Sequence, residues 1–591
     1  MTHDTDPRLD WSLEGEPRSG RFGDVYFSKD DGLAESRAVF LAGCALPEAW
    51  AGRRRFVVGE LGFGTGLNIA ALLTLWRDAR PEGGRLNVFS IEAYPLSLDE
   101  ARRALAAWPE IAPAADALLA AWPFATPGFH RLDLPDFDAV VDLFVGDVED
   151  ALDQWTGRAD AWFLDGFSPA LNPAMWSDAV LDGISARSSP DARLATFTVA
   201  GHVRRGLAAR GFAVDKRPGH GRKRERLEAR RRDPATAQTD AARVVILGAG
   251  VAGAALARAL SAQGAAPIVI DADDGSQASG FPLALVTPRL DAGDAAIAGL
   301  HAQALERAAT LYRAIPQAVA VEGVLQLEGM SRDARRFDRI AEQALWPAGM
   351  MRRLDAAAVA AALGEEAATG GLAMDAALAV RPGRVRDAFL AGTDRITARV
   401  ARIAREGGCW RLLDAAGDTV AEAEVLILSG GWSGAGLWPS APVTPVRGQA
   451  DWVEAPTTRI AAAWGGYAVA DGEKLLFGAT HDRGDAANDP RADDTARNLE
   501  ALRSRLPALA RKIDSAATVS SRAAVRATTP DRLPLAGQVD EGLFVLGGLG
   551  SRGFCVAPLL AEHVAALVAG APSPLAAEHA RRVDPLRFVK S

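Results

Sequence analysis

The sequence predicts two α/β nucleotide-binding domains in tandem, and two stretches carry that prediction. In residues 243–271, a short apolar strand leads into Gly248-Ala-Gly-Val-Ala-Gly253, an alanine- and leucine-rich helix, and a second strand that ends at Asp271. In residues 56–76, another apolar strand leads into Gly62-Phe-Gly-Thr-Gly66 and a helix. A glycine-rich turn between a buried strand and a helix is typical of nucleotide-binding α/β folds.

The stretch at residues 243–271 forms a complete βαβ unit. Gly248 and Gly250 allow a tight turn and a close approach of the backbone to a pyrophosphate at the helix N-terminus, and Gly253 allows close packing of helix and strand. Asp271 lies 18 residues after Gly253, where a carboxylate accepts hydrogen bonds from a ribose. Because all five parts agree, we predict a dinucleotide site. Such units usually open a domain, so we expect the preceding 242 residues to fold separately.

Composition restricts the class of protein. A chain of 591 residues is too long for one hydrophobic core, and its apolar fraction of 49% and charged fraction of 24% are ordinary for a soluble protein. Cys44, Cys409 and Cys555 lie far apart without metal-ligand spacing, which favours a reducing compartment and no metal site. The N-terminus is polar, and no apolar run reaches the length of a membrane helix. We therefore expect a soluble cytoplasmic protein.

Strands and helices alternate regularly between residues 56 and 210, which predicts a parallel sheet that binds ligands at the carboxyl ends of its strands. Four acidic residues fall at or beside those ends: Glu60, Glu92, Asp147 and Asp165. The glycine loop lacks the Lys-Ser/Thr of a triphosphate-binding loop. Four acids suit a cationic, ribose-bearing ligand better than a polyphosphate. For any single acid, a helix N-cap or a surface position stays an alternative.

Two further segments have less specific patterns. The net charge of −9 argues against indiscriminate binding to nucleic acid, but residues 216–232 contain nine Lys or Arg residues against Glu225 and Glu228. That stretch is either a solvated, partly flexible linker or a phosphate-contacting patch. Residues 22–27 alternate in polarity and predict a small hairpin or a sheet edge.

The first domain resembles the class I S-adenosyl-L-methionine (SAM) methyltransferases. The resemblance implies that Glu60 approaches the methionine part of the cofactor, that Glu92 holds the ribose hydroxyls and that Asp147 meets the adenine amino group. The loop glycines Gly62, Gly64 and Gly66 would lie against the methionine part with Glu60.

The loop Asp165-Gly-Phe167-Ser-Pro169 resembles the acid-proline-aromatic loop of methyltransferases that modify amino groups. Methyl transfer needs a nitrogen lone pair in line with the sulfonium methyl group. Asp165 would orient that nitrogen, and Phe167 would form one wall of the acceptor slot.

The second half resembles the glycine and D-amino-acid oxidase class of FAD proteins, which implies a nucleotide domain with an inserted α+β substrate domain. The resemblance places Ser279 and Gly280 around the flavin pyrophosphate, and Gly548 and Gly550 in a turn whose amides face the flavin ring. This chain has Phe281 where the family usually has a polar residue.

Longer motifs make the resemblance specific. Gly-Glu-Leu-Gly-Phe-Gly-Thr-Gly-Leu-Asn (59–68), Trp-Phe-Leu-Asp-Gly-Phe-Ser-Pro (162–169) and Gly-Arg-Lys-Arg-Glu (221–225) resemble the MnmC family of bifunctional tRNA-modifying proteins. The resemblance implies FAD-dependent removal of the carboxymethyl group from 5-carboxymethylaminomethyl-(2-thio)uridine at the wobble position of tRNA. SAM-dependent N-methylation of the resulting aminomethyl group would follow.

The family substrate is in effect an N-substituted glycine, and arginine holds such a carboxylate best. Arg526 and Arg552 are the candidates, with Arg447 third; a surface or domain-bridging arginine is the alternative for each. We expect a methyltransferase domain at 1–232, a linker at 233–242, an oxidoreductase domain at 243–591, and a monomer. Two other functions stay open. One is a free glycine- or sarcosine-type amino-acid oxidase fused to an unrelated methyltransferase, and the other is a methyltransferase with a degenerate, tRNA-docking flavin domain.

Overall fold

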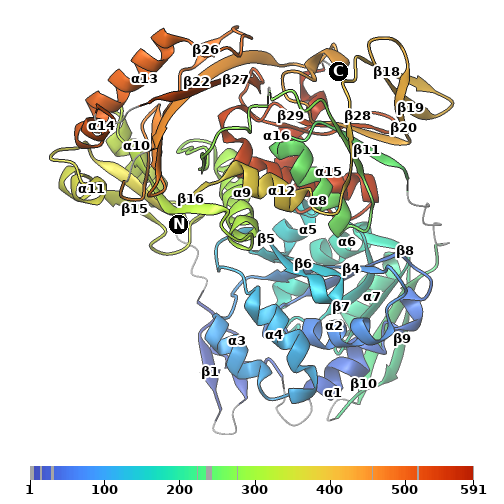
Figure 1. Cartoon of the computed structure of the whole chain (residues 1–591). Helices are drawn as coiled ribbons and strands as arrows, with labels where there is room; N and C mark the ends of the chain where they lie inside the picture. The colour runs from blue at the N-terminus through green and yellow to red at the C-terminus, as the bar shows by residue number, and fades with distance from the viewer. Residues whose placement is uncertain are drawn as a thin grey trace. The chain divides into compact units, whose positions relative to one another are not determined.

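The computed structural model describes residues 6–12, 16–27, 32–221, 224–233, 242–275, 277–454, 457–514 and 518–589. The chain divides into two compact units (Figure 1). The first comprises Met1–Asp240 and Ala571–Ala577, and the second comprises Ala241–Gly570 and Glu578–Ser591. The boundary between the units lies within residues 234–241, which are outside the described residues. These residues make up most of the expected linker.

The first unit is built on a sheet whose described strands follow the order β5-β6-β4-β3-β7-β8-β10-β9. The five central strands are parallel: β3 (Arg55–Leu61), β4 (Arg85–Glu92), β6 (Ala139–Val145), β7 (Ala159–Leu164) and β8 (Ser188–Thr196). Antiparallel pairs add β5 (Gly128–Leu134) at one edge and β10 (Glu225–Arg231) with β9 (Phe212–Pro218) at the other. The predicted parallel sheet is confirmed.

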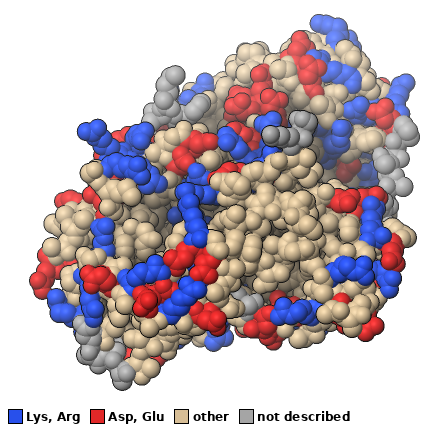
Figure 2. Space-filling model, turned by 90° about the horizontal axis from the view of Figure 1, so that it is seen from above, with Lys and Arg blue, Asp and Glu red and all other residues tan. Residues whose placement is uncertain are grey.

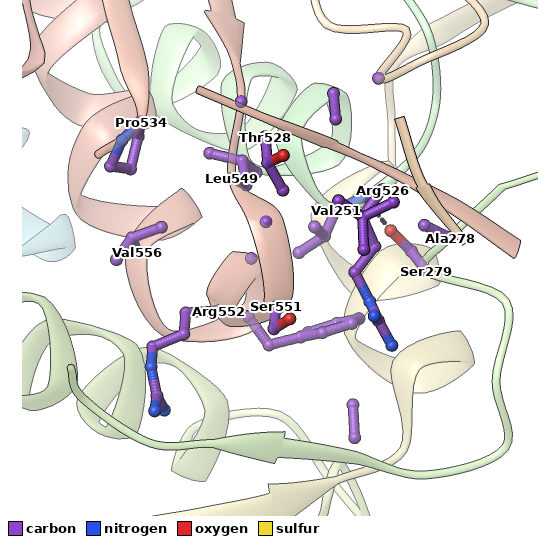
Figure 3. Close-up of a pocket in the computed structure, with 18 of the residues that line it drawn as sticks. Val251, Ala278, Ser279, Arg526, Thr528, Pro534, Leu549, Ser551, Arg552 and Val556 are labelled. Atoms are coloured by element: carbon purple, nitrogen blue, oxygen red, sulfur yellow. Dashed lines mark hydrogen bonds between the residues drawn. The ribbon is translucent and has the colours of Figure 1, made fainter. Parts of the chain in front are cut away.

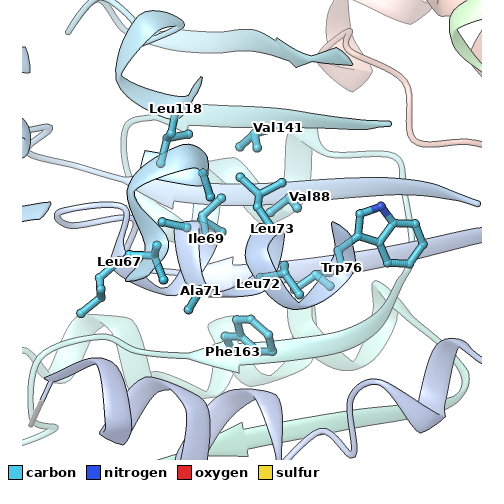
Figure 4. Packing of buried hydrophobic residues seen from close by; sticks show 14 of the residues in the cluster. Leu67, Ile69, Ala71, Leu72, Leu73, Trp76, Val88, Leu118, Val141 and Phe163 are labelled. Carbon is cyan, nitrogen blue, oxygen red and sulfur yellow. The ribbon is translucent and has the colours of Figure 1, made fainter. Parts of the chain in front are cut away.

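Helices cover both faces of this sheet. They are α1 (Gly32–Ser36), α2 (Leu67–Ala79), α3 (Leu98–Leu105), α4 (Ala112–Ala120), α5 (Val148–Gln154), α6 (Asp178–Ala186) and α7 (Gly201–Ala209). Figure 4 shows Leu73 and Trp76 of α2 packed over Val88, Val141 and Phe163 of three central strands. All five side chains are buried, and burying each large apolar side chain contributes roughly 1.5–3 kcal/mol. This packing holds the N-terminus of α2 at the carboxyl edge of the sheet.

Two segments differ from the interpretation of the sequence. The basic stretch expected as a linker or a patch forms the β9–β10 hairpin, because Leu227 and Ala229 are buried in the sheet while charged side chains alternate with them. Residues 22–27 do not form a hairpin of their own. Val25 makes an isolated bridge to Arg18, next to the short pair β1 (Leu9–Trp11) and β2 (Pro17–Ser19).

In the second unit, a nucleotide-domain sheet has the described order β17-β12-β11-β21-β29-β28. Four neighbouring pairs are parallel, and β28 is antiparallel at one edge. The strands are β11 (Val244–Leu247), β12 (Ile268–Asp271), β17 (Asp394–Thr397), β21 (Val425–Leu428), β28 (Leu535–Asp540) and β29 (Leu543–Gly547). Helices α8 (Val251–Ala262) and α15 (Gly553–Ala569) pack against each other and against this sheet.

The inserted substrate domain is a mixed sheet in the order β13-β16-β14-β23-β24-β25-β22-β26, with β15 and β27 joined to β16 and β22. Its strands are β13 (Ala284–Val286), β14 (Val319–Leu327), β15 (Met351–Leu354), β16 (Gly371–Val380), β22 (Thr444–Glu454), β23 (Ile460–Ala463), β24 (Tyr467–Ala470), β25 (Lys474–Gly478), β26 (Asp482–Arg483) and β27 (Ser520–Thr528). A small sheet of β18 (Arg402–Glu406), β19 (Cys409–Leu413) and β20 (Thr419–Ala423) is separate. The remaining helices are α9 (Ala295–Arg313), α10 (Asp333–Ala341), α11 (Ala356–Leu363), α12 (Pro382–Phe389), α13 (Ala492–Arg505), α14 (Pro507–Asp514) and α16 (Ala577–Val583).

Residues Gly550–Ala569, which include α15, are long and apolar enough to cross a membrane by length and composition alone. Of the apolar window in this segment, 72% is buried inside the unit. Glu562, near its middle, is buried and ion-paired with Arg307 of α9 at 2.6 Å and with Arg258 of α8. These contacts identify α15 as a core helix.

Candidate active sites

The first site begins with the glycine loop between β3 and α2. Gly62, Gly64 and Gly66 all have positive φ values, of 92°, 52° and 79°, which L side chains rarely adopt. A Cβ at Gly62 would lie 2.8 Å from the main-chain oxygen of Asp165. The loop therefore lies directly against the Asp165 segment at the carboxyl edge of the sheet.

Glu60 lies behind this loop and is completely buried. Ser90 Oγ donates a hydrogen bond to its Oε2 at 2.5 Å, while its Oε1 has no hydrogen-bond partner among the described residues. Burial raises the pKa of Glu60 to about 8, and Asp165 and Glu92 add to the shift. A buried carboxyl oxygen without a partner is costly, so Glu60 fits a site whose ligand supplies a cationic donor such as the SAM ammonium group.

Glu92 is the last residue of β4, and its side chain contacts both the glycine loop and the loop that follows β4. Its carboxylate accepts hydrogen bonds from Gly64 N and Tyr94 N, both at 2.9 Å. Burial raises its pKa above the ordinary value, and the backbone N–H donors oppose that shift. Glu92, the residue predicted to hold the ribose hydroxyls, therefore also fixes the position of the glycine loop.

Asp147 is exposed, and its side chain caps α5 by accepting a hydrogen bond from Glu149 N at 2.8 Å. The N-cap alternative therefore describes this residue in the structure. The cap uses only one carboxylate oxygen of Asp147. The expected contact with the adenine amino group stays a prediction.

Asp165 and Phe167 follow β7 and are held from two sides. Asp165 Oδ2 accepts a hydrogen bond from Asn68 Nδ2 of α2 at 2.7 Å. The ring of Phe167 lies between the rings of Phe22 and Tyr26, with centroid distances of 5.0 and 5.3 Å. Phe22 and Tyr26, which sequence reasoning did not assign to the site, thus contact the residue predicted to form one wall of the acceptor slot. Their patterns in sequence contain no sign of this long-range contact.

The basic hairpin carries less free positive charge than its composition suggests. Arg222 and Lys223 lie outside the described residues, but five of the other cations are ion-paired: Lys216, Arg217, Arg226, Arg230 and Arg231. Lys216 and Glu225 pair across the hairpin at 2.7 Å, whereas Arg217–Asp215 and Arg226–Glu228 are pairs within one strand. A hairpin neutralised in this way is a weak candidate for a phosphate-contacting patch.

The second site is a cavity of about 1120 Å³ inside the second unit. Its lining includes Gly248, Gly250 and Asp271. Figure 3 shows Ser279 in the lining, with Leu549, Ser551 and Arg552 from the turn at residues 547–553. Sites for drug-sized ligands are roughly 300–1,000 Å³. The larger volume gives room for a dinucleotide together with a substrate.

The βαβ unit has the geometry of a dinucleotide cradle. A Cβ at Gly253 would lie 1.7 Å from Gly248 O, and a Cβ at Gly248 would lie 2.8 Å from Gly430 Cα. Both glycines are therefore required by close backbone packing, and Gly250 faces the cavity. Asp271 ends β12 as predicted, but its Oδ2 already accepts a hydrogen bond from Ala249 N at 2.6 Å.

The Ser279–Phe281 loop closes the same cradle. Ser279 Oγ accepts a hydrogen bond from Val251 N at 3.0 Å, at the N-terminus of α8, and Ser279 lines the cavity. Arg522 of β27 donates to Gly275 O at 2.6 Å and Gln277 O at 3.0 Å. Its guanidinium also occupies the space that a Cβ at Gly280 would need and lies 5.7 Å from the centre of the Phe281 ring. Phe281 is thus held beside Arg522, at the border of the cavity.

Gly548 and Gly550 line the cavity with φ values of 63° and 56°. They precede α15, whose first residue Gly553 lies close to Val251 of α8, since a Cβ there would be 3.3 Å from Val251 Cγ1. Two helix N-termini therefore converge on the cavity, where their free N–H groups favour an anionic or electron-rich ligand. The glycine cradle and the paired helix ends fit FAD.

The three candidate arginines differ in their surroundings. Arg526 lines the cavity, and its guanidinium lies over Gly448, where a Cβ would come within 2.5 Å. Among the described residues it has no hydrogen bond or ion pair, and burial lowers its pKa. Arg552 also lines the cavity, but its Nη1 donates to Thr287 O at 3.0 Å and to Thr287 Oγ1 at 2.5 Å.

Arg447, the third candidate, does not belong to the site. Its side chain is fully buried on the other face of β22 and is ion-paired with Asp494 of α13. It also donates to Gln449 Oε1 at 3.2 Å and to Asp489 O at 2.6 Å. Arg447 holds α13 against the sheet, which its position in the sequence could not reveal.

Sequence reasoning missed several polar and aromatic residues of the cavity. Tyr467 lies beside Arg526, and its pKa is raised by burial, while the charge of Arg526 opposes the shift. Trp464 lies in the same turn. His301 of α9 is 3% exposed, and neither ring nitrogen has a partner among the described residues. Burial lowers its pKa to about 3, and Arg552 adds to the shift. No group of three or more His, Cys, Asp or Glu residues in the described chain is arranged to hold a metal.

Comparisons with known proteins show which families the two halves of the chain resemble. Residues 109–232 match a family described as S-adenosyl-L-methionine-dependent methyltransferase, and residues 243–567 match a family described as FAD dependent oxidoreductase. Iminodiacetate oxidase (IdaA) from Chelativorans sp. BNC1 shares the fold, with a TM-score of 0.50 and 22% identity over 58% of this chain and 99% of that chain.

Two relatives extend over nearly the whole chain, and both are the tRNA 5-methylaminomethyl-2-thiouridine biosynthesis bifunctional protein MnmC. The one from Caulobacter vibrioides is 56% identical over 591 residues, which cover 100% of this chain and 98% of the relative. The one from Maricaulis maris is 43% identical over 588 residues, or 98% of this chain and 96% of the relative. The predicted family, fold class and cofactors are confirmed. This chain therefore belongs to the MnmC family of bifunctional proteins, in which a SAM-dependent methyltransferase is joined to an FAD-dependent oxidoreductase.

Proposed function

We propose that the second unit removes the carboxymethyl group from 5-carboxymethylaminomethyl-(2-thio)uridine in tRNA and that the first unit methylates the amine left behind. The observation that carries the proposal is Arg526, a guanidinium that faces the cavity and has no partner among the described residues. FAD, when bound, would accept a hydride from the carboxymethyl carbon of the C–N bond; water would then hydrolyse the resulting imine, so that the carboxymethyl group leaves as glyoxylate and the amine stays on the tRNA. The residues of the chain must then bind the substrate carboxylate and aim that bond.

Arg526 is the primary carboxylate ligand in this proposal, because its donors are free to form a bidentate pair. Arg552 contributes from the turn before α15, with part of its donor capacity used by Thr287. Gly248, Gly250 and Gly253, with Asp271, Ser279 and Gly280, would hold the dinucleotide, and Gly548 and Gly550 would face the ring. We assign this role to residues 243–591.

In residues 1–232, Asp165 would accept a hydrogen bond from the acceptor amine and orient its lone pair, while Phe167 forms one wall of the slot. Asn68 keeps the Asp165 carboxylate in place. Glu60 and Glu92 would hold the SAM ammonium group and ribose, and Asp147 the adenine. Three free cysteines support a reducing, cytoplasmic location, and we propose a monomer.

Nucleoside mass spectrometry tests this function. Undermodified tRNA that carries the carboxymethylaminomethyl group is incubated with the protein, with and without SAM. We expect loss of the carboxymethyl group in both incubations and methylation only with SAM. Unchanged tRNA in both incubations would refute the proposal, and oxidation of free glycine or sarcosine without action on tRNA would establish an amino-acid oxidase instead. The visible spectrum of the purified protein tests the docking-module alternative, because a degenerate domain would lack flavin bands.

A further inference from the structure

A one-sided row of arginines runs along α10 and begins at the border of the flavin cavity. Arg332, the N-cap residue of α10, is exposed and also lines the cavity. Arg335 and Arg339 follow at the i+3 and i+7 positions, which place all three on one face of a helix. Both are exposed and, unlike Arg332, do not line the cavity. Within the described residues none of the three side chains has a hydrogen bond or an ion pair.

The opposite face of α10 holds the helix in place. Phe337 and Ile340 are buried there. Beside the row, Arg336 lies one turn after Arg332, lines the cavity and donates to Leu290 O at 2.6 Å. The acids of the helix are already occupied. Asp333 accepts hydrogen bonds from Gly329 N and Met330 N, each at 2.9 Å, and Asp338 pairs with Arg353 at 2.8 Å. Of the acids on α10 and just after it, Glu342 alone stays exposed without a described partner.

An aromatic residue lies at the same rim. The turn between β23 and β24 brings Trp464 to the cavity lining, and a Cβ at Gly329 would lie 3.2 Å from Trp464 O. The loop before α10 therefore touches the Trp464 turn. Trp464 is half-buried, so part of its indole is available to a ligand that enters the cavity.

Cations beside an aromatic ring at a cavity mouth suit single-stranded RNA, whose phosphates seek arginine and whose bases stack on aromatic rings. We propose that Arg332 binds the RNA backbone at the mouth of the flavin cavity, that Arg335 and Arg339 bind it farther along the exposed face of α10, and that Trp464 stacks a base of the nucleotide that enters the cavity. The inference rests on the proposed function, in which one base must enter while its backbone stays outside. The protein is acidic overall, and on the face shown in Figure 2 Lys and Arg are interspersed with Asp and Glu. Binding of RNA phosphates therefore needs a local group of cations.

The first test compares two triple variants of the full-length holoprotein. Arg332→Ala/Arg335→Ala/Arg339→Ala removes the row, and Arg395→Ala/Arg402→Ala/Arg581→Ala removes three exposed arginines that lie on other elements and do not line the cavity. Binding of the undermodified tRNA is measured by fluorescence anisotropy at several salt concentrations. Each lost contact to single-stranded RNA lowers the slope of log K against log salt by about 0.7. We expect the α10 variant to lose about two in slope and on the order of tenfold or more in affinity, with flavin content unchanged.

Equal affinity and slope in the two triple variants would overturn the α10 assignment. The second test concerns stacking. Trp464→Ala should raise the KM for tRNA by about fivefold to a hundredfold, whereas Trp464→Phe should restore most of the affinity. A Trp464→Ala variant with the KM of the wild type would overturn the stacking assignment. If the wild-type protein neither binds nor alters this tRNA, the proposed function itself fails; if it alters the tRNA and the α10 variant does so equally well, only this inference fails.

Discussion

Glu60 shows how one buried carboxyl links fold and ligand. Its pKa of about 8 lies above the ordinary 4.5 because burial disfavours the charged form. In the free protein this shift costs stability as pH rises from about 4.5 to about 8, because the unfolded chain loses the proton first. A cationic ligand beside the unpartnered Oε1 reverses the preference and favours the ionised form.

SAM binding should therefore release a proton from Glu60 near neutral pH. We expect SAM affinity to rise between about pH 6 and about pH 8, by at most about tenfold per pH unit. Glu60→Gln should bind SAM more weakly at about pH 8 and should lose that pH dependence. Calorimetry in two buffers of different ionisation enthalpy measures both affinity and proton release. An equally steep pH dependence in Glu60→Gln would assign the titration to another group.

Arg526 and Arg552 give a graded prediction for the oxidative half. Arg526→Ala should lower kcat/KM for the carboxymethyl substrate on the order of a hundredfold, because two charge-assisted hydrogen bonds are lost. Arg552→Ala should have a smaller effect, a rise in the KM for the same substrate, because one of its guanidinium nitrogens already donates to Thr287. Both variants should methylate tRNA that already carries the aminomethyl group at the wild-type rate. Unchanged oxidation kinetics would remove the substituted residue from the site.

At the scale of elements, β27 joins the two parts of the flavin site. Arg522 and Arg526 lie four residues apart, so their side chains leave the same face of the strand. Arg522 holds the carbonyls of Gly275 and Gln277 in the dinucleotide loop, and Arg526 faces the cavity. The strand thus sets the position of the loop relative to the carboxylate ligand.

Arg522→Ala should release the loop at residues 275–281 and weaken FAD binding by roughly tenfold to a hundredfold, the effect expected when about two hydrogen bonds to a charged donor are lost. Quenching of flavin fluorescence on titration into the apoprotein measures the Kd. Arg395→Ala, an exposed arginine on β17 outside the cavity, is the matched control. Equal Kd values for the two variants would contradict this role of Arg522.

Elements with strong local signals could be predicted from the sequence. The parallel strands of both nucleotide folds read as apolar runs, and the glycine turns between strand and helix are fixed by backbone packing, as at Gly253. The β9–β10 hairpin could not be read in the same way, because its strands are rich in charge and few positions are buried. Lys216 and Arg217 pair with Glu225 and Glu228 across the hairpin, and such pairs depend on register.

Long-range contacts explain the remaining differences at the sites. Ser168 N donates to Asp24 Oδ2 at 3.2 Å across 144 residues of sequence, and this contact accompanies the packing of Phe22 and Tyr26 on Phe167. From the sequence, Arg447 was a candidate carboxylate ligand, but in the structure it is ion-paired with Asp494 of α13. Residue types that can bind a ligand or take part in catalysis could be recognised in the sequence. The face of the strand on which each of them lies depended on contacts with residues far away in the sequence.

At the scale of the whole molecule, each compact unit carries a complete set of candidate residues for one reaction. Glu60, Glu92, Asp165 and Phe167 belong to the first unit, whereas the cavity with Arg526 and Arg552 belongs to the second. Each unit has its own sheet and its own buried core. A substitution at one site should therefore leave the chemistry of the other intact.

This independence predicts complementation between two variants, each impaired in a different one of the two activities. Asp165→Ala should accumulate the aminomethyl nucleoside, because loss of the group that orients the amine slows methyl transfer by about a hundredfold or more, while SAM binding by calorimetry stays near that of the wild type. Arg526→Ala should leave the carboxymethyl group in place. A mixture of the two variants with SAM should form the methylated product, since the intermediate stays attached to tRNA and can pass between molecules. Mass spectrometry of the mixture against each variant alone measures this. If each variant keeps its unaltered activity but the mixture yields no methylated product, the intermediate must be passed between the two sites of one chain.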